Sequence, residues 1–458
     1  MQGRCFVVAG AGIAGAAAAR VLLEHGARVR VIERRDSEAL QALRDGGAEV
    51  VLADPGAGEL PAGLLDGVDE VVVSPGLAPH TPIATAAAAA HLPVSSEPEL
   101  AWRLRGPDAP AWLAVTGTNG KTTTVTMLAA MLAAAGLRTA ALGNIGEPLV
   151  DATADHARFD VLAVELSSFQ LHWSSTLAPQ GGAWLNLADD HLEWHLSMEA
   201  YADAKTAIWR SAGRGGVAVG NLDDPEVARR LAVVDGHRVG FSVRQEPGPD
   251  RFARRDGWLV ASVGGELVPV IEEERIRPAG VHNVANALAA AALASWYGVP
   301  VTAIGAALAG YTPEPHRNAL VATVAGVAYV DDSKATNPHA AHASLTAYPR
   351  IVWIAGGQLK GVDVAGLVAD VADRLAGVVL LGIDREEIAV ALARHAPDVP
   401  VVDVARTDDG AMAEVVRAAA ALARPGDTVL LAPAAASKDM FRSYSHRGDA
   451  FAEAVQAQ

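Results

Sequence analysis

The sequence predicts an α/β protein of three domains, and three observations support that prediction. Short apolar runs alternate with alanine- and leucine-rich helical patterns along the whole chain, which is typical of largely parallel sheets. Two segments rich in proline, glycine and charge, residues 103–112 and 310–317, interrupt this alternation. A chain of 458 residues also fits about three domains. We expect a Rossmann-like domain over 1–108, a P-loop NTPase-like parallel sheet over 109–313 and a Rossmann-like domain over 314–458.

Composition and charge limit the partners and the cellular compartment that we expect for this protein. Apolar residues make up 51% of the chain and charged residues 20%, as in proteins with sizeable buried cores. The net charge of −16 and the pI near 5.3 disfavour nucleic acid and anionic membrane as partners. Cys5 is the single cysteine, which fits a reducing compartment. The apolar start has regularly spaced glycines, and no run has transmembrane character, so we expect a cytoplasmic protein without a signal peptide.

The first domain begins with a predicted strand, a glycine-rich turn, a helix and a second strand. Gly10, Gly12 and Gly15 form a GxGxxG pattern, and Glu33 ends the second strand. Such glycines let the backbone approach a phosphate or a ribose, and the helix N-terminus favours anions. The pattern alone leaves a dinucleotide cofactor, another nucleotide and a structural turn open. Residues 74–76 follow a further apolar strand, where α/β sheets bind ligands, although an ordinary turn is the alternative.

A second glycine-rich loop follows the first strand of the central region. The stretch LAVTGTNGKTTT has Val115 where the pattern GxxxxGK[ST] has its first glycine. Gly117 and Gly120 still free the backbone, so that several N–H groups can face one anion. Lys121 can reach the β- and γ-phosphates, and the Thr122 hydroxyl can ligate Mg²⁺. We interpret the stretch as a nucleotide loop rather than as a turn with a solvated lysine.

Polar side chains follow two further predicted strands of the central sheet. Glu165 ends the run FDVLAVE, and Asn186, Asp190 and His191 follow the run GGAWL. Because parallel strands end at one edge of a sheet, we expect these groups beside the phosphate loop. Glu165 and His191 are therefore candidate Mg²⁺ ligands. Mg²⁺ prefers oxygen, so a hydrogen-bonding or structural role for His191 is the alternative.

Lys205 lies on an apolar face of a predicted helix. Tyr201 is at i−4, Ile208 at i+3 and Trp209 at i+4. Either the amine extends to solvent from a buried stem, or the amine itself is buried with a depressed pKa. A neutral amine reacts with CO₂ to give a carbamate, which would turn a cation into an oxygen donor for a metal ion.

Taken in order along nearly the whole chain, these and other motifs resemble the ATP-dependent Mur ligase family of peptidoglycan synthesis. The central region contributes TGTNGKTTT, GNIGEP, VELSSFQL, NLADDHLEWH with Lys205, and HNVANALAAAA. In the third domain, VDDSKATNPHA, IAGGQLKGVD and APAAASKDMFRSYSHRGDAF resemble the D-glutamate-adding branch. The resemblance implies joining of D-glutamate to UDP-N-acetylmuramoyl-L-alanine through an acyl phosphate. It also implies ATP and two Mg²⁺ ions but neither NAD nor FAD, and we expect a monomer.

The resemblance implies roles for individual residues, which are grouped here by ligand. The uridine diphosphate group would contact Gly12, Ile13, Ala14, Gly15, Glu33, Arg35, Ser74 and Gly76. ATP would contact Gly117, Thr118, Asn119, Gly120, Lys121, Thr122, Thr123, Asn286, Arg317 and Asp332, with Asn144 near the phosphates and the substrate. One Mg²⁺ would lie near Thr122 and Glu165, and the other near His191 and carbamylated Lys205. D-Glutamate would contact Lys334, Thr336, Lys360, Ser437 and Tyr444. The groups expected to act directly in catalysis are Lys121, His191 and Lys205.

Some positions keep alternatives or depart from the family pattern. The alternative for Asn286 is that it is a residue on a helix surface. The alternative for Arg317 is that it is a charged residue of a linker. Glu33 stands where related chains often have aspartate, which puts its contact in doubt, and Tyr444 stands where some relatives have phenylalanine. Ser437 can also be the N-cap of a following helix.

Three other functions compete with this one. A sister ligase that adds another residue is disfavoured because DSKATN is present and a DNPR-type motif is absent. A nicotinamide-dependent oxidoreductase accounts for GAGIAG but leaves TGTNGKTTT unexplained. A nucleotide-binding protein without activity would be expected to lack Lys121, Glu165 or Lys205, and all three are present.

Overall fold

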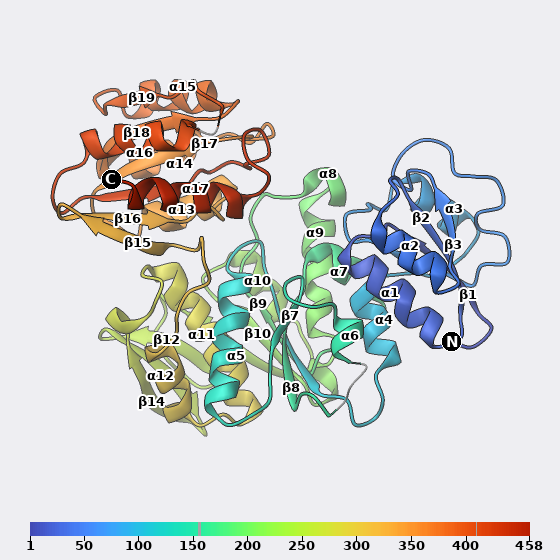
Figure 1. Ribbon diagram of the computed structural model, residues 1–458. Coiled ribbons are helices and arrows are strands. Elements are labelled where there is room, and N and C mark those ends of the chain that lie inside the picture. Colours follow the sequence, from blue (N-terminus) through green and yellow to red (C-terminus); the bar gives the residue numbers. More distant parts are fainter. Residues whose placement is uncertain (154–156, 409) are drawn as a thin grey trace. The chain divides into compact units, whose positions relative to one another are not determined.

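Three stretches of the chain each build their own sheet, with helices packed against it (Figure 1). The computed structural model describes residues 1–153, 157–408 and 410–458. The first of its two compact units comprises Met1–Glu273 with Ala285–Ala309, and the second comprises Glu274–Val284 with Gly310–Gln458. The predicted α/β class with three sheets is confirmed, whereas the predicted boundaries near 108 and 313 stay predictions.

Five parallel strands in the order β3-β2-β1-β4-β5 form the first sheet. Every residue of β1 is buried, which explains its unbroken apolar sequence. Because β1 pairs with both β2 and β4, its carboxyl end lies where the strand order reverses, the usual place for a ligand. The elements are β1 Cys5–Ala9, α1 Ile13–Glu24, β2 Arg28–Glu33, α2 Glu38–Asp45, β3 Glu49–Leu52, β4 Glu70–Val73, α3 Pro82–Ala89, β5 Val94–Ser95 and α4 Glu97–Leu104.

Nine strands in the order β14-β13-β12-β11-β10-β9-β6-β8-β7 form the second sheet. Its strands are β6 Ala111–Thr116, β7 Ala141–Gly143, β8 Val161–Glu165, β9 Gly181–Trp184, β10 Val217–Asn221, β11 His237–Ser242, β12 Arg251–Arg255, β13 Trp258–Val263 and β14 Glu266–Glu272. The helices of this region are α5 Lys121–Ala134, α6 Leu149–Ala152, α7 Ser168–His172, α8 Leu192–His195, α9 Met198–Thr206, α10 Pro225–Leu231, α11 Val281–Tyr297 and α12 Val301–Ala309, with short 3₁₀ turns at Ala207–Trp209, Ala212–Arg214 and Glu273–Arg275.

The second sheet is parallel from β7 to β12 and then becomes antiparallel. Two two-residue turns cause this change, Asp256–Gly257 between β12 and β13 and Gly264–Gly265 between β13 and β14. All four turn residues have positive φ, as a type I′ hairpin requires. The central sheet therefore carries a β-meander that a purely parallel prediction does not include.

Six strands in the order β15-β16-β20-β17-β18-β19 form the third sheet, which is parallel except for the edge strand β15. Its strands are β15 Ala319–Val324, β16 Val327–Asp331, β17 Ile351–Gly356, β18 Leu375–Leu381, β19 Val401–Asp403 and β20 Thr428–Leu431. Its helices are α13 Pro338–Leu345, α14 Ala365–Val371, α15 Arg385–His395, α16 Ala411–Leu422 and α17 Tyr444–Gln456, with a 3₁₀ turn at Ala372–Arg374.

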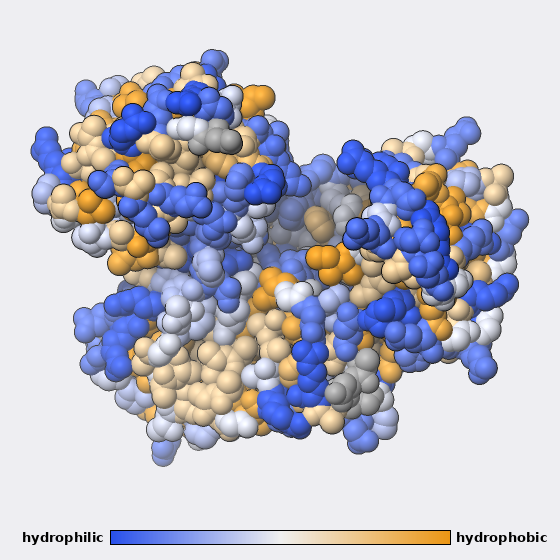
Figure 2. Space-filling view, in the orientation of Figure 1, coloured by the Kyte–Doolittle hydropathy of each residue, from blue (hydrophilic) through white to orange (hydrophobic). Residues whose placement is uncertain are grey.

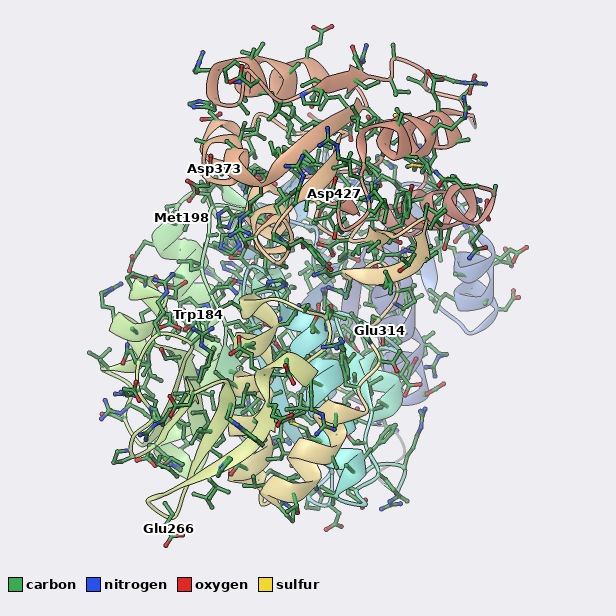
Figure 3. The ribbon with its side chains drawn as sticks, turned by 90° about the vertical axis from the view of Figure 1, so that its left-hand side faces the viewer. Trp184, Met198, Glu266, Glu314, Asp373 and Asp427 are labelled. Carbon is green, nitrogen blue, oxygen red and sulfur yellow. The ribbon has the colours of Figure 1, made fainter. Side chains whose placement is uncertain are left out.

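Buried tryptophans anchor the central sheet, and the surface is mixed. Trp184, labelled in Figure 3, ends β9 fully buried, and its indole N–H donates to the carbonyl oxygen of Asn186 at 3.1 Å. This bond fixes the start of the loop that carries Asp190 and His191. On the face shown in Figure 2, hydrophobic side chains lie in small groups between hydrophilic ones. In the described part of the chain, no helix combines the length and the apolar character needed to cross a bilayer.

Glu97 is a buried carboxyl group that joins two helices of the first unit. It stands in the first turn of α4, and its Oε1 accepts a hydrogen bond from the backbone N–H of Val150 in α6 at 2.7 Å. Burial raises the pKa of Glu97 to about 8, even though backbone N–H groups of α6 lower it. The group is therefore protonated in the folded chain at pH values where an exposed glutamate is ionised.

Glu97→Gln is expected to change how stability depends on pH. Because the folded-state pKa is raised, the contribution of Glu97 is fully present below its ordinary pKa of 4.5 and is lost as pH rises through about 8. Wild type should therefore lose stability relative to the variant between these values, as measured by urea unfolding at several pH values. The exposed Glu59→Gln is the control and should follow wild type. Parallel wild-type and Glu97→Gln curves would contradict the assignment.

Candidate functional site

The glycine-rich loop between β6 and α5 has the geometry of an anion-binding turn. Gly120 precedes the first turn of α5 with φ +83°, a left-handed conformation that favours glycine. A Cβ atom at Gly120 would also overlap the side-chain amide of Asn286 in α11. The structure thus places the predicted adenine contact, Asn286, directly against the phosphate loop. The N-terminus of α5, a helix of 14 residues, faces the loop and favours negative charge there.

Side chains hold this loop in place from both sides. The Lys121 ammonium donates to the carbonyl oxygens of Gly117 and Thr118, both at 2.9 Å. Asn186, at the end of β9, accepts from the backbone N–H of Asn119 at 2.9 Å and donates to its carbonyl oxygen at 3.1 Å. These bonds fix the backbone of the loop and place the Lys121 ammonium against it.

An oxygen-rich group lies at the first turn of α5, at the end of β8. The Thr122 hydroxyl donates to one oxygen of Glu165 at 2.6 Å, and the Asn144 amide donates to the other at 2.8 Å. Glu165 and Thr122 are both buried, and Thr123 is buried beside them. A hydroxyl and a carboxylate in contact are the donors that Mg²⁺ prefers. The predicted pair Thr122 and Glu165 therefore fits one Mg²⁺ ion.

Lys205 is buried, so its amine does not extend to solvent. Its side chain is 1% exposed, its amine donates to the carbonyl oxygen of Gly117 at 2.9 Å, and it lies 4.5 Å from the ring centre of Tyr201. Burial lowers the pKa of Lys205 well below its ordinary value, and the nearby Lys121 charge lowers it further, against the attraction of Asp190. A lowered pKa favours the neutral amine, and the neutral amine is the form that reacts with CO₂.

His191 precedes α8 in a left-handed conformation, with φ +57°. Its Nδ1 lies 3.4 Å from a carboxylate oxygen of Asp190, and its ring centre lies 4.7 Å from that of Phe169. Partial burial lowers the pKa of His191, against the charge of Asp190. No cluster of three or more His, Cys, Asp or Glu side chains suited to a metal occurs among the described residues. A second Mg²⁺ ion would fit here only with an added oxygen donor, such as a carbamate on Lys205.

The glycine turn of the first sheet is braced by two side chains that the sequence singled out. The Ser74 hydroxyl donates to the carbonyl oxygen of Gly10 at 3.1 Å. The Glu33 carboxylate accepts backbone N–H bonds from Ala11 and Arg34, both at 2.7 Å. A Cβ atom at Gly15 would overlap the Gly10 carbonyl oxygen, so α1 packs closely on the turn. The remaining predicted residues lie around it: Gly12, Ala14, Arg35 and Gly76, with Ile13 81% exposed.

In the second unit, Lys334 and Tyr444 lie together, as their predicted common ligand requires. The Lys334 ammonium is 3.9 Å from the ring centre of Tyr444, a cation–π contact. The backbone N–H of Thr336 donates to the carbonyl oxygen of Lys334 at 2.8 Å. Tyr444 begins α17, and its side-chain cap is Ser443.

The loops that carry Lys360 and Ser437 are paired through their backbones. Gln358 and Ala436 exchange two N–H···O bonds, of 2.8 and 2.9 Å. Lys360 follows with φ +56°, and Ser437 is buried. The expectation that Ser437 caps a helix is wrong. Residues 438–440 form only a turn in which the Ser437 carbonyl oxygen accepts two N–H bonds, and the helix begins at Tyr444.

Asp332, the predicted ribose contact, is buried at the end of β16. It accepts bonds from the Ser344 hydroxyl and from the backbone N–H of Asn318, the latter at 3.1 Å. Burial raises the pKa of Asp332 to about 6, although the Ser344 bond and the Arg317 charge lower it. Arg317 therefore lies within electrostatic reach of Asp332, and both belong to the second unit.

Tyr201 and His195 are neighbours of the site that the sequence analysis did not assign. The Tyr201 hydroxyl lies 3.1 Å from the hydroxyl of Thr118 in the phosphate loop, beneath Lys205. His195 packs on Tyr201 with ring centres 4.9 Å apart. The i−4 spacing of Tyr201 to Lys205 was a usable signal, whereas the contact of His195 depends on the packing of three short helices.

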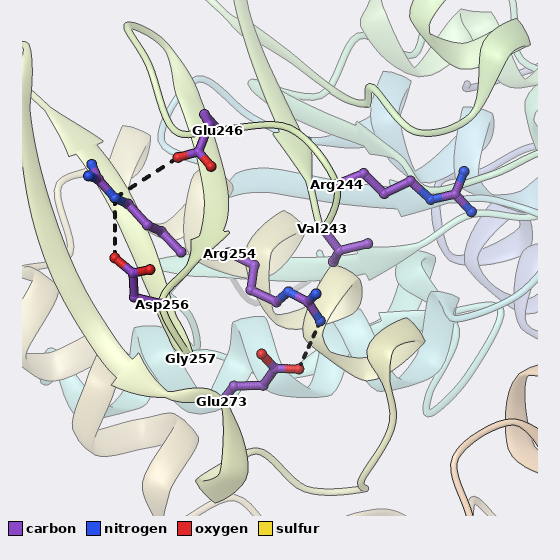
Figure 4. A pocket seen from close by; sticks show the side chains of 8 residues that line it. Val243, Arg244, Glu246, Arg254, Asp256, Gly257 and Glu273 are labelled. Atoms are coloured by element: carbon purple, nitrogen blue, oxygen red, sulfur yellow. Dashed lines mark hydrogen bonds and ion pairs between the residues drawn. The ribbon is translucent and has the colours of Figure 1, made fainter.

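A polar pocket of about 630 Å³ lies elsewhere, on the meander of the second sheet (Figure 4). Arg254 pairs with Glu273 at 3.2 Å, and Arg255 pairs with Asp256 at 3.5 Å. Its acidic and basic groups balance, and none of them is a predicted site residue. The full lining is Val243, Arg244, Glu246, Arg254, Arg255, Asp256, Gly257 and Glu273.

Comparison with known protein families gives three matches that together cover most of the chain. Residues 4–96 match the Mur ligase MurD-like N-terminal domain, residues 115–294 the Mur ligase middle domain, and residues 316–435 the Mur ligase glutamate ligase domain.

Curated relatives match over the full length. The chain is 54% identical to the UDP-N-acetylmuramoylalanine–D-glutamate ligase of Thermobifida fusca, over 100% of this chain and 99% of the relative. It is 54% identical to the protein of the same name from Frankia casuarinae, over 99% and 94%, and 51% identical to that of Streptomyces coelicolor, over 99% and 98%.

Solved structures share the fold at low sequence identity. A pseudomurein peptide ligase type C from Methanothermus fervidus has a TM-score of 0.58 at 18% identity, covering 99% of both chains. The UDP-N-acetylmuramate-alanine ligase of Thermotoga maritima has a TM-score of 0.57 at 19% identity, again covering 99% of both chains.

Proposed function

The chain belongs to the Mur ligase family, and on that premise we propose that it joins D-glutamate to UDP-N-acetylmuramoyl-L-alanine with consumption of ATP. The observation that carries this proposal is the full-length match, at about half identity, to ligases named for that reaction. The reaction builds a peptidoglycan precursor, so the protein serves cell-wall biogenesis and, through it, cell shape and division.

Residues of the central region would bind ATP and orient it for the reaction. The backbone N–H groups of the loop 117–120 and the N-terminus of α5 bind the phosphates, and Lys121 supplies the positive charge. Thr122 and Glu165 would hold one Mg²⁺ ion, and His191 with a carbamate on Lys205 would hold the other. Bound Mg²⁺ supplies positive charge for the phosphate oxygens during transfer. Asn144 keeps Glu165 oriented through its amide.

The reaction proceeds in two balanced steps. An oxygen of the L-alanine carboxylate attacks the γ-phosphorus of ATP, the bond to the ADP oxygen breaks, and an acyl phosphate forms. The D-glutamate nitrogen then attacks the acyl carbon, a proton leaves the nitrogen, and phosphate departs as the amide forms. Both steps gather negative charge on oxygen, which Lys121 and the helix N-terminus stabilise.

The remaining substrate contacts are proposed for the other two sheets. The turn at Gly12–Gly15, with Arg35, Ser74 and Gly76, would hold the uridine diphosphate. Glu33 would act through the loop that it braces. Lys334, Thr336, Lys360, Ser437 and Tyr444 would hold D-glutamate, and Asn286, Arg317 and Asp332 would contact ATP. We further propose that the protein works as a cytoplasmic monomer with two Mg²⁺ ions and with neither nicotinamide nor flavin.

Phosphate release from ATP is the direct test. With UDP-N-acetylmuramoyl-L-alanine present, D-glutamate should give stoichiometric phosphate and amide, whereas L-glutamate, diaminopimelate and lysine should give neither. Turnover with another amino acid would assign a sister ligase. ATP cleavage that never yields an amide would overturn the proposal.

A further inference from the structure

Four aromatic side chains pack between the two residues proposed to hold the second cation. We call Phe169, Trp194, His195 and Tyr201 the aromatic cluster. Phe169 contacts the His191 ring at 4.7 Å between centres, and the Tyr201 ring lies 4.5 Å from the Lys205 amine. Both proposed ligands therefore contact the same cluster, whose residues belong to α7, α8 and α9.

His195 lies at the centre of this cluster. It is 5% exposed, and its ring centre lies 4.4 Å from that of Trp194, 4.9 Å from Tyr201 and 5.6 Å from Phe169. Its Nε2 lies 2.9 Å from the Ser168 hydroxyl, a hydrogen bond that ties α8 to the first turn of α7. The segment leading into α7 begins at Glu165, the ligand proposed for the first cation.

The helix that carries His195 needs outside support. α8 has only four residues and begins just after His191, whose left-handed backbone is uncommon for a residue with a side chain. One turn of helix does not hold itself in water. The side chains of α8, with Trp194 and His195 buried, therefore fix the direction in which His191 points.

A histidine is energetically unfavourable at this buried position in the aromatic cluster. Its Nδ1 is buried without a hydrogen-bond partner among the described residues. Burial lowers the pKa of His195 to about 3, so its imidazole is neutral near pH 7 and keeps a single ring N–H. A buried nitrogen without a partner is unfavourable, because it has lost its hydrogen bonds to water. Phenylalanine would fill the cluster without that loss but would break the bond to Ser168.

We propose that His195 is a positioning residue: through Ser168 and Tyr201 it holds His191 and Lys205 in the arrangement that binds the second cation. The inference rests on the proposed function, because that function assigns the two ligands. His195 touches no substrate in this scheme and acts only through its neighbours. Its hydrogen bond, rather than its ring alone, is what the arrangement requires.

Mn²⁺ binding to the full chain with a non-hydrolysable ATP analogue tests this inference by electron paramagnetic resonance. Wild type should bind two ions. His195→Phe, which keeps the ring and loses the bond, should weaken one of them by about 10-fold or more, the usual effect of losing a group behind a ligand. His195→Gln places an amide near the Nε2 position and should recover most of the affinity. Ser168→Ala should reproduce the phenylalanine variant.

His172→Phe is the matched control, because His172 packs on Trp194 at 5.1 Å from the outer side of the cluster. It should bind both ions as wild type does. Unchanged Mn²⁺ binding in His195→Phe, or a lowered melting temperature with unchanged binding, would overturn the inference while wild-type ligation stood. If wild type ligates nothing and binds one ion or none, the proposed function fails first and this inference fails with it.

Discussion

Lys121→Ala should abolish ligation, with kcat reduced by at least about 10³-fold. The carbonyl oxygens of Gly117 and Thr118 accept hydrogen bonds from the Lys121 ammonium and hold it at the phosphate loop. Its removal leaves the γ-phosphate without its main cationic partner, so acyl phosphate formation should stop. ADP formation in single-turnover conditions measures that step directly.

Two variants control for charge and shape. Lys121→Arg keeps the charge but replaces a compact ammonium by a planar fork, so partial activity is expected. Arg255→Ala removes one positive charge from the pocket of Figure 4, which has no role in the scheme, and should behave as wild type. Near-normal turnover by Lys121→Ala would refute the assignment of the phosphate loop.

Lys205→Met should lose the second cation and reduce ligation by at least about 10²-fold. Methionine keeps much of the buried volume but cannot form a carbamate. In the carbamate that we propose, the amine nitrogen bonds to the carbon of CO₂ and releases one proton. Enzyme equilibrated with ¹³C-bicarbonate should therefore show a carbamate carbonyl resonance that the variant lacks.

The resonance should also depend on pH in a stated direction. Burial lowers the pKa of Lys205, which favours the neutral amine, and acidification should protonate it and weaken the signal. Native mass measurement of the Mg²⁺-bound enzyme offers an independent check. A bare amine at Lys205 in that state would remove the carbamate from the scheme.

Much of the fold and the reaction class was predictable because the signals are local. The glycine loops, the strand-ending Glu165 and the family motifs lie within short stretches, and parallel strands bring their ends to one edge. The hydrogen bond of Thr122 to Glu165 is the direct result. The family predicted from those motifs is confirmed, and the full-length relatives are named for the D-glutamate-adding reaction that the same motifs predict.

Other features depend on tertiary packing or on turn geometry. The helix after Ser437 begins only at Tyr444, with Ser443 as its cap, because the residues that follow Ser437 form a local turn on its carbonyl oxygen. The contacts of His195 depend on how α7, α8 and α9 pack against one another, and the sequence alone does not give that packing. Asp256–Gly257 and Gly264–Gly265 indicate the two hairpin turns of the meander in the central sheet. The prediction of a parallel sheet did not use them. The roles assigned to individual site residues stay predictions.

Glu33, at the end of β2, holds the glycine turn of the first sheet in place. In nicotinamide-binding folds, the acidic residue at this place grips the ribose hydroxyls. Here both carboxylate oxygens are committed to the main chain, at Ala11 and at Arg34. A ribose hydroxyl that approached Glu33 would have to share an oxygen that already accepts a main-chain hydrogen bond. We therefore expect a dinucleotide to gain less from Glu33 than from an acidic side chain whose oxygens are both free.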